Sequence, residues 1–210
     1  KISLNLISIL NDKLSKIPGL EDFKAVVIGG FAVNKYGEDS KIPYLGYLTN
    51  DIDVKICGSL DKITKEQITK IFDSIPSEYR SEQHMIDKND LNKQKWVSLQ
   101  LYKTVLLPVL RAKIISIFSE SLKQLTVDTS VWAIRNTYRE ISKNINYFPE
   151  DYPVKLKFKG HEVMDVTFSF SDSILCNNSN GTFNLTNKTV NIPLISLQAL
   201  AKNLVSQFHS

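Results

Sequence analysis

The stretch Leu-Thr-Asn-Asp-Ile-Asp-Val-Lys-Ile at residues 48–56 decides the fold of this chain. From Asp51 onward charged residues alternate with apolar ones, a pattern that predicts a short β-strand with the two kinds of side chain on opposite faces. The apolar side chains then point into a core, while Asp51, Asp53 and Lys55 share the other face. Two neighbouring carboxylates repel each other, and a divalent metal ion removes that repulsion by taking both as ligands. The stretch therefore predicts a metal site, with an ordinary solvated strand face as the alternative.

A second signal lies just upstream, at residues 25–37. Residues 25–28 are apolar and predict a buried strand, Gly29 and Gly30 break it, and a helix is expected from Phe31. A glycine turn lets the backbone approach an anion closely, and the start of a helix offers free N–H groups to it. A Gly-Gly pair alone marks an ordinary turn. Followed by two aspartates on the next strand, it indicates a phosphate site.

The combined pattern Gly-Gly-x-Ala…Thr-x-Asp-Ile-Asp resembles the signature of the DNA polymerase β-type nucleotidyltransferases. The resemblance implies an α/β (α+β) fold, with a small mixed sheet flanked by helices. It also implies that Gly29 and Gly30 bind the triphosphate of a nucleotide, that Thr49 shapes the turn before the acids, and that Asp51 and Asp53 hold two Mg²⁺ ions, or Mn²⁺. Many members of the superfamily carry Gly-Ser in place of Gly-Gly, so this chain lacks one serine contact to a phosphate.

A β-hairpin is predicted near the other end of the chain, with strands at residues 154–159 and 163–170. A three-residue loop at 160–162 matches the hydrophobic faces of the two strands, and that match sets the register. In this register Lys157 lies opposite Asp165.

Asp165 is the candidate for the third carboxylate that the resemblance implies. It lies in the middle of a predicted strand, where β propensity disfavours aspartate. Asp172 is the poorer alternative because it follows the regular alternation. In the superfamily the third acid ligates the ion that activates the attacking hydroxyl and acts as its general base. Lys157 or Lys55 is expected to neutralise charge in the pocket.

Periodicity and turn residues assign the rest of the chain. We expect helices at 2–14, 61–72 (capped from its Ser-Leu-Asp start) and 193–208, a strand at 95–102, a loop at 177–188, and a helical insertion at about 105–147 with helices at 112–125 and 130–143. Basic residues are spread along the insertion and predict either a solvated face or a surface for a phosphodiester backbone: Arg111, Lys113, Lys123, Arg135, Arg139 and Lys143.

Bulk properties set outer limits. The 210 residues suit one catalytic domain, and a first residue that is not methionine suggests a piece of a longer chain. The net charge of +4 permits a nucleic-acid partner without requiring one. Cys57 and Cys176 show no pairing pattern, so we expect free buried thiols in a reducing compartment. No segment is long and apolar enough to cross a membrane, so we expect a cytoplasmic protein without a membrane partner.

Among the nucleotidyltransferases, the chain most resembles the poly(A) polymerase catalytic subunits of poxviruses and giant DNA viruses, through residues 25–56 and 163–170. This implies an mRNA-processing enzyme that adds AMP from ATP, or another nucleotide, to an RNA 3′ end, in the host cytoplasm or the virion. A homodimer or a processivity subunit is compatible with that role. The rival is a minimal nucleotidyltransferase of the antibiotic-modifying or toxin–antitoxin kind. A third alternative is a non-catalytic nucleotide-binding module, which the intact acids disfavour.

Overall fold

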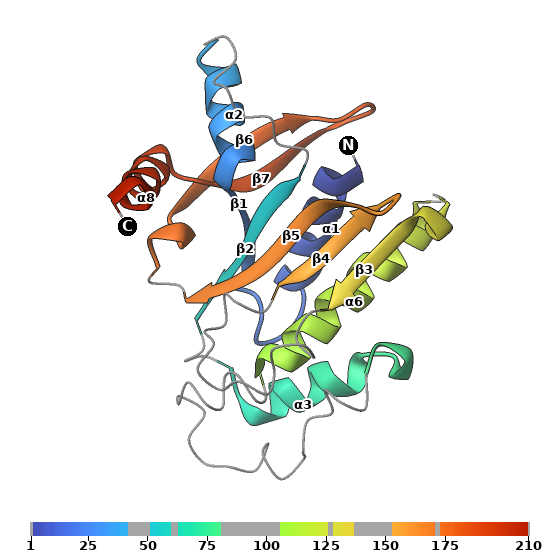
Figure 1. The fold of residues 1–210 in the computed structure, drawn as a ribbon. Coiled ribbons are helices and arrows are strands. Elements are labelled where there is room, and N and C mark those ends of the chain that lie inside the picture. The colour runs from blue at the N-terminus through green and yellow to red at the C-terminus, as the bar shows by residue number, and fades with distance from the viewer. Residues whose placement is uncertain are drawn as a thin grey trace.

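A mixed β-sheet organises the protein (Figure 1). The computed structural model describes residues 2–41, 51–59, 63–80, 106–125, 128–136, 153–170 and 173–209. Within these residues the sheet has seven strands in the order β3-β4-β5-β2-β1-β7-β6. The strands are β1 (Lys24–Ile28), β2 (Ile52–Gly58), β3 (Trp132–Asn136), β4 (Val154–Phe158), β5 (His161–Phe170), β6 (Asn178–Asn184) and β7 (Thr189–Ile195). The helices are α1 (Ile2–Ser15), α2 (Gly29–Asp39), α3 (Lys65–Ser74), α6 (Leu107–Gln124) and α8 (Leu197–His209), with short 3₁₀ turns η1 (Ser77–Tyr79), η4 (Thr129–Val131) and η6 (Ile174–Cys176).

The centre of the sheet combines parallel and antiparallel pairing. β2 pairs antiparallel with β1 and parallel with β5, while β1 pairs parallel with β7. Two antiparallel hairpin partners, β4 and β6, extend the sheet on either side of this centre. The prediction of a mixed α/β protein is confirmed, with a sheet larger than the small one expected.

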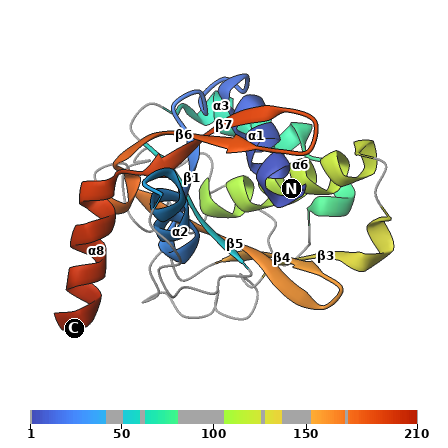
Figure 2. The same ribbon diagram turned by 90° about the horizontal axis from the view of Figure 1, so that it is seen from above.

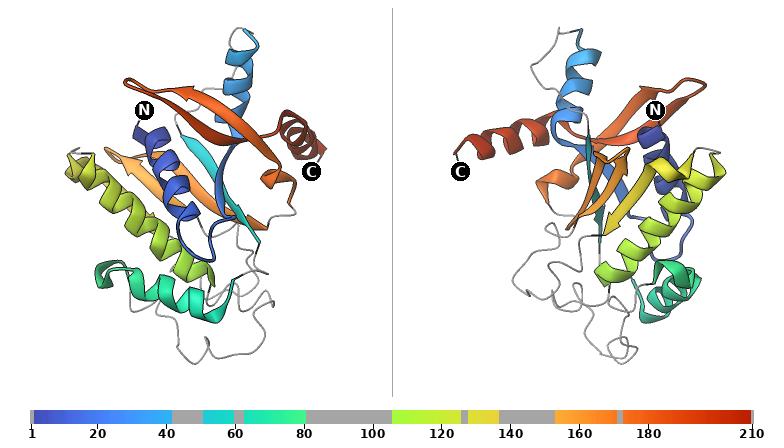
Figure 3. Two further views of the ribbon diagram at one scale, coloured as in Figure 1. Left: turned by 180° about the vertical axis from the view of Figure 1, so that it is seen from behind. Right: turned by 45° about the vertical axis from the view of Figure 1, so that its right-hand side comes forward.

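Helices α1 and α6 cover one face of the sheet, as the front and back views show together (Figures 1 and 3). The apolar side chains of the central strands are buried on this side. Ile52, Val54 and Ile56 of β2 are each at most 6% exposed, as the alternation of residues 48–56 predicts. Asp53 alternates with these residues along β2, so its side chain lies on the opposite face of the sheet.

Helices α2 and α8 lie side by side next to β1 and β7, and α8 then runs outward from the sheet (Figure 2). The hydroxyl of Tyr36 on α2 donates a 2.6 Å hydrogen bond to the carbonyl of Ile195 at the end of β7. This bond ties the helix that follows the glycine turn to the neighbouring strand, and so fixes the turn's position.

The predicted helical insertion is only partly helical. Helix α6 confirms the expected helix at 112–125 and begins earlier, at Leu107. The expected helix at 130–143 is wrong over Trp132–Asn136, which form the edge strand β3. Trp132 and Ile134 alternate with Ala133 and Arg135, a period of two that suits a strand paired with β4. Residues 137–150, and the strand expected at 95–102, lie outside the described residues.

Three further boundaries differ from prediction. Helix α3 begins at Lys65 and is capped by Thr64, whose hydroxyl accepts a hydrogen bond from the Gln67 backbone, rather than by the Ser-Leu-Asp segment. The loop expected at 177–188 is largely strand β6, because Gly181 and Phe183 are buried while Asn180, Thr182 and Asn184, which alternate with them, are exposed. The C-terminal helix begins at Leu197, since the preceding residues from Thr189 to Ile195 are strand β7.

The two cysteines form a disulfide bond between β2 and η6, with 5.7 Å between their Cα atoms. The expectation of free thiols is therefore wrong. The sequence carries no pairing signal because the cysteines lie 119 positions apart, and the parallel pairing of β2 with β5 brings η6 beside the end of β2. The inference of a reducing compartment loses its basis. Separately, none of the described helices is long and apolar enough to span a lipid bilayer.

Candidate active site

The two central acids occupy matching positions on adjacent strands. Asp53 of β2 pairs in register with Asp165 of the parallel strand β5, and with Ile28 of β1 on its other side. Side chains at matching positions of paired strands share a face. The structure thus brings together Asp53 and Asp165, which are 112 positions apart in the printed sequence, and Asp51 lies immediately before β2.

The glycine turn packs directly against this pair. Helix α2 begins at Gly29, two residues earlier than expected, and Gly29 has a φ of +69°. A Cβ atom at this position would lie 2.7 Å from Oδ2 of Asp53, so both the backbone conformation and the space require glycine. The residue before the helix, Ile28, makes no side-chain cap. The first N–H groups of α2, at Gly29 and Gly30, are therefore not taken up by a capping side chain.

Charge repulsion and burial raise the pKa of the acids. The pKa of Asp53 rises from 3.8 to about 6, chiefly through burial and then through the negative charges of Asp51 and Asp165. The pKa of Asp165 is also raised, again chiefly by burial, while the nearby Lys155 opposes the rise. These mutual effects mean that the three carboxylates are close enough to repel one another.

One oxygen of this group is left without a partner. Oδ1 of Asp165 is buried and makes no hydrogen bond within the described part of the chain. A buried carboxylate oxygen in that state is unfavourable unless a proton or a metal cation binds it. The donor set of carboxylate oxygens is also the one that Mg²⁺ prefers. Among the described residues no three His, Cys, Asp or Glu side chains already converge as a metal site, so an ion would have to draw the acids together.

Lys55 is the buried cation of the site. It is 7% exposed, lies on β2 two residues after Asp53, and has Val26 and Thr167 as its cross-strand neighbours. Its positive charge partly opposes the rise in the pKa of both Asp53 and Asp165. Of the two lysines that the sequence proposes for neutralising the pocket, Lys55 is the one whose charge acts on both acids.

The hairpin register differs from the predicted one. Its turn has two residues, Lys159 and Gly160, both with positive φ, and the pairing shifts between Leu156 and Lys157. This bulge places the extra residue, Val163, on β5 and restores the match of Leu156 with Met164. The hydrophobic faces therefore match as expected, but through a bulge rather than a three-residue loop, and the predicted pairing of Leu156 with Val166 is wrong.

The shift in pairing changes which lysine of β4 lies opposite Asp165. Lys155, and not Lys157, lies opposite Asp165, while Lys157 lies opposite Glu162. Lys155 donates from Nζ to Oε1 of Glu162 at 3.0 Å, and this bond, followed by the charge of Asp165, raises its pKa. Lys155 and Glu162 were therefore not among the site residues predicted from the sequence. A Lys-Gly pair as a two-residue turn is the signal that would have found them.

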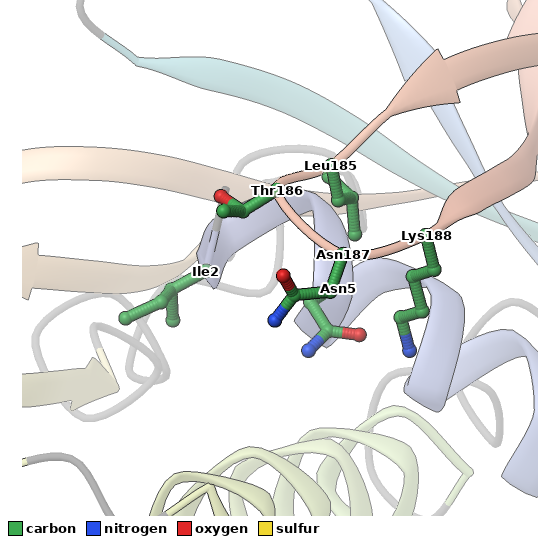
Figure 4. A pocket seen from close by; sticks show the side chains of 6 residues that line it. All are labelled: Ile2, Asn5, Leu185, Thr186, Asn187 and Lys188. Carbon is green, nitrogen blue, oxygen red and sulfur yellow. The ribbon is translucent and has the colours of Figure 1, made fainter.

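Two candidate residues, Thr49 and Asp172, lie outside the described residues. A separate hollow of about 380 Å³ lies between α1 and the β6–β7 turn (Figure 4). Its lining includes Asn5, Thr186 and Lys188 and contains none of the predicted site residues.

Comparison with protein-family models, with curated proteins and with solved structures finds no match to this chain. Its function is therefore argued from the motif and from the geometry of the acids.

Proposed function

We propose that this protein is a metal-dependent nucleotidyltransferase of the DNA polymerase β type, which adds AMP from ATP to the 3′ hydroxyl of an RNA, as a poly(A) polymerase does. One observation carries the proposal: Asp53 and Asp165 lie in register on adjacent strands, and the Gly29 turn packs against Asp53. The paired acids suit a metal-bound phosphate, and the turn suits the rest of a triphosphate.

In this proposal Asp51, Asp53 and Asp165 hold two Mg²⁺ ions. When bound, the ions lower the pKa of the attacking hydroxyl and stabilise negative charge on the leaving group. Asp165 takes the proton from the 3′ hydroxyl, for which its raised pKa suits it. The hydroxyl oxygen then bonds to the α-phosphorus, the bond from that phosphorus to the bridging oxygen breaks, and pyrophosphate leaves.

The chain's other residues bind and orient the nucleotide. The backbone of Gly29 and Gly30 binds the β- and γ-phosphates at the start of α2, where the helix dipole favours negative charge. Lys55 holds a positive charge beside the acids and limits their repulsion before metal and nucleotide arrive. An RNA 3′ end as acceptor, and a second copy of the chain or a processivity subunit as partner, belong to the same proposal.

The test is transfer itself. The protein is incubated with Mg²⁺, labelled ATP and a short single-stranded RNA, and the RNA is sized on a gel. The proposal expects a ladder of extended RNA that chelation of the metal abolishes. Label found instead on a protein or small molecule would mean the rival class of minimal nucleotidyltransferases. No transfer, with nucleotide still bound, would mean a non-catalytic module.

A further inference from the structure

A row of charged side chains crosses the sheet at the level of the acids. The register aligns Arg135 of β3 with Lys155 of β4, Lys155 with Asp165 of β5, and Asp165 with Asp53 of β2. Residues at matching positions share a face, so two cations stand directly beside two carboxylates. Figure 1 shows these strands adjacent in this order, with β3 at the edge.

Lys157 adds a third cation on the same face, because it lies two residues beyond Lys155 on a regular stretch of β4. We define Arg135, Lys155 and Lys157 as the cationic ledge. On β5 the carboxylate of Glu162 bonds Lys155.

The usual reason for lysines on a strand does not apply here. Charged residues on an edge strand discourage pairing with another chain. However, β4 is an internal strand, hydrogen-bonded to β3 on one side and β5 on the other. Lys155 and Lys157 are half-buried on this strand, where a positive charge is favourable only beside negative charge, and Glu162 supplies such a charge to Lys155.

The order of the groups across the sheet indicates where an acceptor would lie. The glycine turn, which in the proposed function binds the triphosphate, follows β1 at one end of the row. Asp53 and Asp165 lie in the middle, and the ledge lies at the far end. An acceptor hydroxyl at Asp165 therefore belongs to a molecule that extends over β4 and β3, away from the incoming nucleotide.

We infer that the cationic ledge binds the phosphodiester backbone of the acceptor just upstream of its 3′ hydroxyl, so that the acceptor is a single-stranded polynucleotide and not a small molecule or a protein. This inference rests on the proposed function, which puts the hydroxyl at Asp165. Phosphate oxygens are the natural partners of arginine and lysine side chains presented in a row. The phosphates of a bound strand would place further negative charge beside these three cations.

The test measures binding of a 5′-fluorescein-labelled single-stranded RNA by anisotropy, over a range of salt concentrations. The variant Arg135→Gln/Lys157→Gln leaves the Lys155–Glu162 pair intact. The matched control is Lys70→Gln/Lys188→Gln, which removes the same charge from exposed positions on α3 and the β6–β7 turn. For the ledge variant we expect the slope of log affinity against log salt to fall by about 0.7 for each phosphate that is no longer neutralised, so about 1.4 in all. The control should keep the parent slope.

A ledge variant that behaves like its control would overturn the inference, and so would a parent that binds no RNA or labels only a protein or small molecule. The shift in melting temperature caused by Mg²⁺ with ATP, measured on the same samples, separates the two proposals. If the parent shows this shift while the ledge variant keeps full RNA binding, the role of the cationic ledge is refuted and the proposed function stands. A parent without the shift loses the proposed function, and the inference falls with it.

Discussion

The two hairpins of the sheet have the same topology and opposite surface chemistry. β6 and β7 pair over seven residues without a break, and neither strand contains a charged residue. β4 and β5 pair through a bulge and carry Lys155, Lys157, Glu162 and Asp165 on their outer face. Each hairpin buries apolar side chains on its inner face, so the core does not explain this difference.

Polar side chains of the β6–β7 hairpin pair with one another across the strands. Thr182 donates to Asn191 across the strands at 3.0 Å, and Thr189 donates to Asn184 at 3.1 Å. In the charged hairpin, by contrast, the buried Oδ1 of Asp165 has no partner within the described residues. A surface whose polar groups bond to one another suits a structural hairpin. A surface with a buried polar atom that lacks a partner suits a site that binds a ligand.

Among the changes that test this difference between the hairpins, replacing Asp53 with alanine should have the largest effect, on the rate of nucleotide transfer. A metal-bridging carboxylate contributes several kcal/mol to charge stabilisation in the transition state, so we expect Asp53→Ala to slow transfer by about 10³-fold or more. The fold should persist, because the loss relieves repulsion among the acids. Steady-state transfer to RNA and circular dichroism measure the two effects.

The uncharged hairpin supplies the control for this substitution. Asn191→Ala removes a cross-strand hydrogen bond of β6–β7 and should leave the transfer rate unchanged. Near-parent activity of Asp53→Ala, or an equal loss in both variants, would contradict a catalytic role confined to the charged hairpin and β2.

The disulfide bond pins the segment that joins the two hairpins, since η6 lies between β5 and β6. Removing it with Cys57→Ala and Cys176→Ala should lower the free energy of unfolding by about 2–5 kcal/mol, because a long loop of the unfolded chain is no longer closed. Urea denaturation measures this loss. Reduction of the parent should produce the same change, and a parent whose midpoint ignores the reductant would show that the bond is not formed.

Ligand binding should stabilise the charged half of the sheet. Mg²⁺ together with ATP should raise the free energy of unfolding by about 2.7 kcal/mol at a hundredfold excess over the dissociation constant. For a chain of this size that is a shift in melting temperature of about 5–10 °C. Either ligand alone should shift it much less, because the acids and the phosphates each need the ions between them. An unchanged melting curve with both present would argue against a nucleotide site.

The sequence predicts the centre of the site better than its surroundings. Alternation within residues 48–56 is enough to place Ile52 in the core and Asp53 on the opposite face, and an aspartate in the middle of a strand is unusual enough to single out Asp165. Both signals are local, so a single sequence carries them.

The predictions that fail depend on contacts between segments that are distant in the sequence, or on segments too short to show a clear periodicity. The sequence misplaces the lysine beside Asp165 because a bulge and a longer loop both bring the two hydrophobic faces together. They differ in which residues pair, and the backbone at Lys159 and Gly160 distinguishes them. The Cys57–Cys176 bond arises from the order of strands in the sheet. A helix is predicted where β3 lies because five residues are too few for periodicity to distinguish helix from strand.

The smallest expected effect is a dependence of stability on pH that belongs to the acids alone. The pKa of Asp53 is about 6 in the folded protein against 3.8 for an ordinary aspartate. Between these values the folded state holds a proton that the unfolded chain does not, so this group's stabilising contribution is fully present below about 3.8 and is lost as the pH rises through 6. The metal-free parent should therefore gain stability, relative to Asp53→Asn, when the pH falls from 7 to about 5.

Mg²⁺ should act in the opposite sense, because ions and protons compete for the same oxygens, and its stabilising effect should grow as the pH rises through 6. Melting temperatures of the parent, Asp53→Asn and the surface control Asp12→Asn across this range measure both trends. If the parent and Asp53→Asn differ by the same amount at every pH, the carboxylate of Asp53 is not held among the other acids, and the contrast between the two hairpins loses its electrostatic basis.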